Sequence, residues 1–190
     1  MTPITLSPHE VKLALKGEPF QLIRPVEHNI ASNLDYDPRD ASYGPFFEDE
    51  YGDSREVIEL SPFGKPGDEF WVQEEWRQAY PETSYSKGIV YRADKAKALG
   101  MDEYSDHYTW QPASLMLCEI SRLTLTHTGT EVKRVQDVAF SEIVHGLGWD
   151  GNKTPYSIPE WFMKNWQSQH PDYPWEENPW VFIGKFEVKR

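Results

Sequence analysis

The sequence predicts an α+β domain built on a small β-barrel or a strongly curled sheet with short flanking helices. Short segments rich in β-branched and aromatic residues recur along the chain, helical patterns are few, and the two do not alternate in β-α-β order. A chain of 190 residues suits one domain, residues 1–190. The aromatic content of 14% indicates a core filled largely by Trp, Tyr and Phe side chains.

The first expected elements are a helix and a short strand. Ser7 is a suitable helix N-cap, Pro8 suits the first helical position, and a glycine follows the last apolar residue. These signals predict a helix at about 8–16. A brief strand is expected at 20–23, and Pro25 is expected to stop it.

A long acidic insertion loop is expected at about 27–59. Residues 35–59 hold nine acidic residues and two arginines, a net charge of −7 in a chain whose total is −12. The segment has little periodicity, so we expect an irregular insertion, followed by a short strand at 57–60. Its aromatic side chains either pin the loop to the protein or make it an acidic docking surface for another protein.

The stretch at 64–76, GKPGDEFWVQEEW, is expected to be a turn that leads into a core strand. Pro66 and Gly67 suit the two central positions of a type II turn. The bulky residues at 70–72 favour a strand, and we expect Trp71 in the core. The charged residues just beyond it then either lie in solvent or face a cleft.

The rest of the chain predicts three strands and two helices. The run at 118–128 has the clearest strand pattern because it alternates and is rich in Thr, and the terminal strand is expected to be central because both of its faces are apolar. Trp110 and Trp180 are expected in the core. The expected elements are a strand at 88–93, a strand at 118–128 with a β pattern continuing to 137, a short helix at 140–147, a helix from 158 and a strand at 178–188.

Several kinds of chemistry find no support in the sequence. It lacks a phosphate-binding Gly-rich loop, a Ser nucleophile elbow and paired Cys or His at metal spacing, so no metal and no cofactor are expected. Cys118 is the only cysteine, which excludes an internal disulfide. No apolar run or signal segment is present, which predicts a cytoplasmic protein without membrane contact.

Aromatic residues recur beside charged ones, which is typical of surfaces that stack bases and bind their edges. The pairs are Trp71 with Glu74, Trp76 with Arg77, Tyr91 with Arg92, and Tyr108 and Trp110 near Arg122. The alternative is that these rings only fill the core. The candidate binding residues are Arg24, Lys65, Glu74, Glu75, Trp76, Arg77, Arg92 and Arg122.

A series of motifs resembles the ASCH-domain proteins of bacteriophages and prophages, which belong to the PUA-like superfamily. The resemblance covers about residues 4–25 and 60–188. It rests on a helix ending in Leu-x-Gly, then PGDxxWVxExW, YRAD, WxPAxxM, VxRVQD and ENPWVFxxxFE. It implies a PUA-like small β-barrel with flanking short helices, a cleft suited to RNA or a nucleotide, and the cytoplasm of a bacterial host cell.

Some proteins of the family that this chain resembles are amidohydrolases of acylated cytidine, and they use a Lys, a Thr and a Glu for catalysis. Here Pro19 and Phe20 stand where the Lys and the Thr would fall, and His145 lies near the expected Glu. Without the Lys amine and the Glu carboxylate, the chain lacks the groups that this mechanism needs, so no catalytic residue is assigned.

Three functions follow as hypotheses. The leading one is a non-catalytic module that binds RNA, single-stranded nucleic acid or a modified nucleotide. The second is a nucleoside amidohydrolase with a relocated constellation that uses Glu74, Glu75 or His145. The third is an interaction protein whose acidic segment at 35–59 mimics nucleic acid or docks on a host protein.

Overall fold

The computed structural model describes residues 1–32, 34–35, 45–48, 51, 54–78, 88–94, 109–143, 147 and 157–189. The chain divides into two compact units. Unit 1 comprises Met1–Glu18, Glu69–Thr126 and Glu187–Arg190. Unit 2 comprises Pro19–Asp68 and His127–Phe186.

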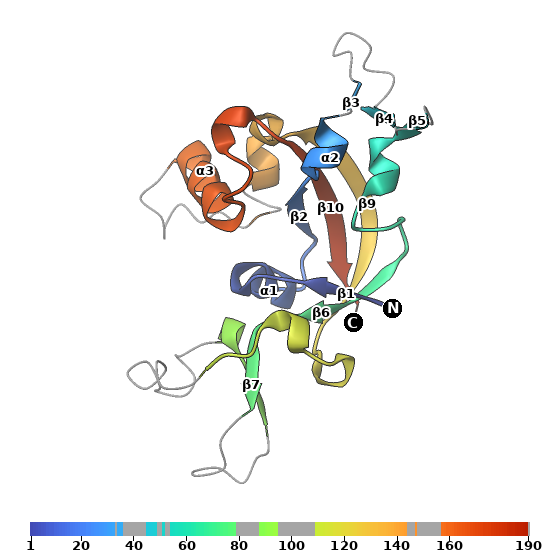
Figure 1. The fold of residues 1–190 in the computed structure, drawn as a ribbon. Coiled ribbons are helices and arrows are strands. Elements are labelled where there is room, and N and C mark those ends of the chain that lie inside the picture. The colour runs from blue at the N-terminus through green and yellow to red at the C-terminus, as the bar shows by residue number, and fades with distance from the viewer. Residues whose placement is uncertain are drawn as a thin grey trace. The chain divides into compact units, whose positions relative to one another are not determined.

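The architecture is mixed α and β, with a core made mostly of sheet and few helices (Figure 1). The described strands form open sheets of five, three and two strands, and the largest has the order β1-β6-β9-β10-β2. The two ends of this order do not pair among the described residues, so a closed barrel, one of the two forms that the sequence predicts, is not formed there. The α+β class itself is confirmed.

Unit 1 contains β1 paired in parallel with β6, and the start of β9 antiparallel to β6. A separate antiparallel hairpin is formed by β7 and β8. The elements of unit 1 are β1 (Thr2–Thr5), α1 (Pro8–Leu15), β6 (Glu69–Gln73), β7 (Trp76–Gln78), β8 (Ile89–Tyr91), and the 3-10 turns η2 (Arg92–Asp94), η4 (Ala113–Leu115) and η5 (Cys118–Ile120).

Helix α1 begins where its cap predicts. The Glu10 amide donates to Ser7 Oγ at 3.4 Å and the Ser7 amide donates to Glu10 Oε2 at 2.7 Å, which is a capping box. Val11 and Ala14 are fully buried and anchor the inner face of the helix. The predicted helix is confirmed.

The turn before β6 is also confirmed. The Asp68 amide donates to the Lys65 carbonyl at 3.0 Å, and Gly67 has the positive φ of 96° that this turn requires. The expectation for Trp71 is wrong, because Phe70 and Val72 are the buried residues of β6 and Trp71 is only half-buried. Successive side chains of a strand point to opposite faces of the sheet, so the buried face of β6 holds Phe70 and Val72, and Trp71 between them lies on the other face.

Unit 2 is organised on β10, which lies between β9 and β2 (Figure 1). Helix α3 packs its buried Phe162 and Trp166 into a core with Val181 and Ile183 of β10. The central position of the terminal strand and the buried Trp180 are therefore confirmed. The elements here are β2 (Phe20–Pro25), β9 (Thr124–Arg134, whose first residues belong to unit 1), η6 (Val135–Asp137), α3 (Ile158–Gln169), η8 (Trp175–Glu177) and β10 (Trp180–Val188).

Close approach of an aromatic ring fixes one glycine in unit 2. A Cβ placed on Gly184 would lie 2.4 and 2.7 Å from ring carbons of Phe63. The Phe63 ring meets Phe186 edge-on, with centroids 5.3 Å apart, and both rings lie against the buried His127. The imidazole Nε2 is 2.8 Å from Thr130 Oγ1.

The acidic insertion is more regular than predicted. Its described part holds α2 (His28–Ala31), the strands β3 (Leu34–Asp35), β4 (Phe46–Glu48) and β5 (Ser54–Glu56), and the 3-10 turn η1 (Val57–Leu60). The three strands form an antiparallel sheet. The prediction of an irregular loop is wrong for this part, and the strand expected at 57–60 is a 3-10 turn that buries Val57.

Three other boundaries differ from the sequence prediction. Residues 118–120 form a 3-10 turn, so the strand expected from 118 begins at Thr124 and continues to Arg134. Strand β2 includes Pro25, which is tolerated because β2 is at an edge of the sheet. The helix expected at 140–147 is helical at 140–143, and most of its remainder lies outside the described residues. No helix in the described part of the chain has the length and apolar character needed to cross a membrane.

Candidate functional site

The candidate residues are distributed over both units. Arg24 and Lys65 belong to unit 2, where Arg24 Nη1 donates to the Ile23 carbonyl at 2.9 Å. The other six belong to unit 1, around the end of β6 and the β7–β8 hairpin: Glu74, Glu75, Trp76, Arg77, Arg92 and Arg122. The candidate site is therefore described from unit 1.

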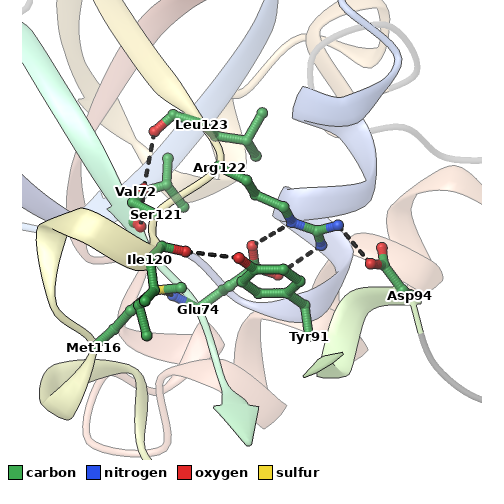
Figure 2. Close-up of polar contacts among 9 residues, drawn as sticks. All are labelled: Val72, Glu74, Tyr91, Asp94, Met116, Ile120, Ser121, Arg122 and Leu123. Atoms are coloured by element: carbon green, nitrogen blue, oxygen red, sulfur yellow. Dashed lines mark hydrogen bonds and ion pairs between the residues drawn. The ribbon is translucent and has the colours of Figure 1, made fainter. Parts of the chain in front are cut away.

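The centre of this site is an ion pair between Glu74 and Arg122 (Figure 2). Arg122 Nε and Nη2 donate to the two Glu74 oxygens at 2.8 and 2.9 Å, which is the bidentate geometry. Arg122 Nη1 donates at 2.5 Å to Asp94. The Glu74 side chain is only 2% exposed, whereas Arg122 is 22% and Asp94 45% exposed.

Strand geometry places Glu74 inside. Phe70 and Val72 are buried on β6, and Glu74 continues this alternation by one more step. The Glu74 amide donates to Met116 Sδ at 3.3 Å, so the sulfur of a buried side chain covers the strand end. Ser121 Oγ lies 2.8 Å from the Val72 carbonyl and fastens the chain just before Arg122 to β6.

Tyr91 forms one wall of the ion pair. The Arg122 guanidinium carbon lies 4.1 Å from the centre of the Tyr91 ring, and the Tyr91 hydroxyl donates to the Ile120 carbonyl at 2.7 Å (Figure 2). Burial raises the pKa of the Tyr91 phenol above its ordinary value; Arg122 opposes this rise, and Glu74 and Asp94 add to it. Tyr91 therefore stays protonated and serves as a donor.

Arg122 is held in its charged form. Burial alone lowers the pKa of this guanidinium, but its hydrogen bonds to Glu74 and Asp94 outweigh that effect, so the pKa lies above its ordinary value. The arrangement stabilises a fixed positive charge on Arg122.

Two more arginines lie beside this pair in unit 1. Arg92 Nη1 donates to both oxygens of Glu75, at 2.7 and 2.6 Å. The Arg77 guanidinium carbon lies 5.1 Å from the centre of the Trp110 ring. Trp76 is bridged to Gln111 by two backbone hydrogen bonds, and its indole Nε1 is buried without a hydrogen-bond partner.

The described site is balanced in charge. It holds three arginines and three carboxylates: two of the carboxylates pair with Arg122 and one pairs with Arg92, whereas Arg77 lies over Trp110. A basic cleft of the kind that attracts phosphate therefore does not result from the described residues alone.

No family model, no curated protein and no solved structure matches the chain.

Other residues that the sequence analysis discussed do not belong to the described site. Among the described residues, no group of His, Cys, Asp or Glu is arranged to hold a metal ion. Cys118 is an exposed free thiol. Phe20 is buried, and the centre of its ring lies 6.1 Å from that of Phe186. His145 and Tyr108 lie outside the described residues.

The sequence interpretation missed Asp94 as a partner of Arg122, and it assigned Tyr91 and Trp110 to the wrong arginines. It paired Tyr91 with its neighbour Arg92 and Trp110 with Arg122, whereas the structure places Tyr91 on Arg122 and Trp110 on Arg77. The YRAD motif contains both Tyr91 and Asp94, and it was the available signal.

Unit 2 holds a second polar network. Lys133 Nζ contacts Glu142 at 2.9 Å and Glu131 at 2.8 Å, and Lys185 also donates to Glu131. Hydrogen bonds from Lys133 and Lys185 lower the pKa of Glu131, although burial opposes them. Burial lowers the pKa of Lys133, but its bonds to Glu131 and Glu142 prevail and raise it. Lys133 therefore stays charged and is not a nucleophile.

Proposed function

We propose that this protein is a PUA-like binding module for RNA, single-stranded nucleic acid or a modified nucleotide, and that the binding surface belongs to unit 1. The motif resemblance to phage and prophage ASCH-domain proteins supports the fold family and the bacterial setting. The geometry adds a reason to choose unit 1, which holds six of the eight candidate residues.

One observation carries the proposal: Arg77 lies over the ring of Trp110. A guanidinium stacked on an indole offers a flat, cationic platform, and bases stack on such platforms whatever their sequence. Arg92 is 44% exposed on the neighbouring strand end and adds a donor for phosphate or a base edge.

Binding is favoured over chemistry at this surface. The amidohydrolase alternative needs a free carboxylate, and both described carboxylates named for it are bound to arginines, Glu74 to Arg122 and Glu75 to Arg92. Incubation of the pure protein with acylated nucleosides tests that alternative, and release of the acyl group would establish it.

The test of binding uses Arg77→Ala and Trp110→Ala. Fluorescence anisotropy with a labelled single-stranded oligouridylate should show binding by the native protein and a loss of about 1 to 3 kcal/mol for Trp110→Ala, the usual effect of removing a stacking ring. Lys12→Ala, an exposed change of equal charge on α1, is the matched control for Arg77→Ala. Equal affinities of both site variants and the native protein would contradict the proposal.

Arg122→Ala is unsuitable for this assay. It would leave the Glu74 carboxylate buried without a cation, and any loss of binding would then report a damaged fold.

A further inference from the structure

Two arginines of unit 1, Arg92 and Arg122, bind carboxylates through nitrogens that could otherwise donate to a phosphate. Arg92 Nη1 donates to both carboxylate oxygens of Glu75, and Arg122 Nη1 donates to Asp94. Both carboxylates are partly exposed, at 32% and 45% of their side-chain surface, so these contacts lie within reach of solvent. Carboxylate and phosphate oxygens use the same guanidinium donors.

We propose that Glu75 and Asp94 determine the specificity of this site by competing with phosphate for Arg92 and Arg122. The inference rests on the proposed function, because the phosphate concerned is that of the proposed ligand. Glu74 is different: it is buried and satisfies Arg122 as part of the core.

Chain connectivity makes this competition effective. A carboxylate on the same chain is present at an effective concentration on the order of millimolar or more, and it needs no encounter to bind. A phosphate must displace it and desolvate the arginine as well. The site therefore disfavours ligands that bind mainly through their backbone, and it favours ligands held by stacking on Arg77 and Trp110.

The prediction concerns the salt dependence of binding. Each arginine released to phosphate should steepen the slope of log affinity against log salt by about 0.7 for a single strand. Glu75→Gln releases Arg92, Asp94→Asn releases one nitrogen of Arg122, and the double variant releases both. For one such contact, the ratio of affinities at 50 and 200 mM salt should rise by a factor of roughly 2.6.

The control is Glu119→Gln. Glu119 is exposed in η5 of the same unit and has no arginine partner among the described residues, so this change alters the net charge by the same amount. A second control, Arg92→Ala in the Glu75→Gln background, should return the slope to its native value. It separates release of Arg92 from a general change in charge.

The experiment is anisotropy of a labelled oligouridylate with the full chain over a series of salt concentrations. A steeper slope in Glu75→Gln and Asp94→Asn, absent in Glu119→Gln and reversed by Arg92→Ala, supports the inference. Slopes equal to that of Glu119→Gln overturn it. Should the native protein fail to bind while Glu75→Gln binds, the inference stands and the proposed function fails.

Discussion

Arg122→Met should be among the most destabilising single substitutions in unit 1. The change removes the cation that binds both oxygens of Glu74, a side chain with 2% of its surface exposed. Removing one partner of a buried ion pair leaves an uncompensated charge and costs about 3 to 5 kcal/mol. Proteins are stable by only about 5 to 15 kcal/mol, so this loss is a large fraction of the total.

The geometry also says what would restore stability. Replacing both partners by apolar residues, in Arg122→Met with Glu74→Leu, removes the buried charge together with its partner and should recover most of the loss. Asp94→Asn affects only an exposed contact of Arg122 and should cost about 1 kcal/mol or less. It is the matched control, because it breaks a bond to the same guanidinium.

Urea unfolding and thermal unfolding, each followed by Trp fluorescence and by circular dichroism, measure these differences. For a chain of this length, the single variant should lower Tm by about 6 to 20 °C, since each kcal/mol shifts Tm by about 2 to 4 °C. A cost below about 1 kcal/mol for Arg122→Met would refute the reasoning. So would a double variant as unstable as Arg122→Met alone, because the loss would then not come from the stranded carboxylate.

Three further outcomes are expected in the same unfolding assay. Gly184→Ala should destabilise unit 2 by about 1 to 3 kcal/mol, because its new Cβ would overlap an aromatic ring; a change below about 0.5 kcal/mol would contradict this. Glu131 has a lowered pKa because of Lys133 and Lys185, so its contribution is present above about pH 4.3 and is lost as the pH falls through its folded value. Glu131→Gln should therefore reduce stability at pH 7 by less than about 1 kcal/mol and by less still at pH 3, and an equal deficit at both pH values would argue against the linkage. Ser7→Ala should cost about 1 kcal/mol through the capping box of α1, and a neutral effect would show that the cap is dispensable.

Local signals in the sequence predict the fold well where neighbours in the chain decide the structure. The cap of α1 and the turn at 65–68 depend on residues within four positions of one another, and both occur as predicted. The central place of β10 follows from a run that is apolar on both faces, and it is also confirmed.

The features that could not be predicted from the sequence depend on contacts between residues far apart in the chain or on strands too short to show a pattern. Glu74 looks like a charged residue at a strand end, and only Arg122, 48 positions away, makes its burial possible. The short strands β3, β4 and β5 have two or three residues each, which is too few to reveal a period of two in an acidic segment. The phase of β6 likewise depends on its neighbours, so Trp71 was placed on the wrong face.

The division of the chain into interleaved segments has a consequence for its synthesis. The chain leaves unit 1 after Glu18 and returns to it at Glu69. It leaves unit 1 again after Thr126 and enters it a last time at Glu187–Arg190. The Lys189 amide donates to the Thr124 carbonyl at 2.9 Å, and its ammonium lies 2.5 Å from Glu69. A ribosome must therefore translate Lys189 before unit 1 can form all of its contacts.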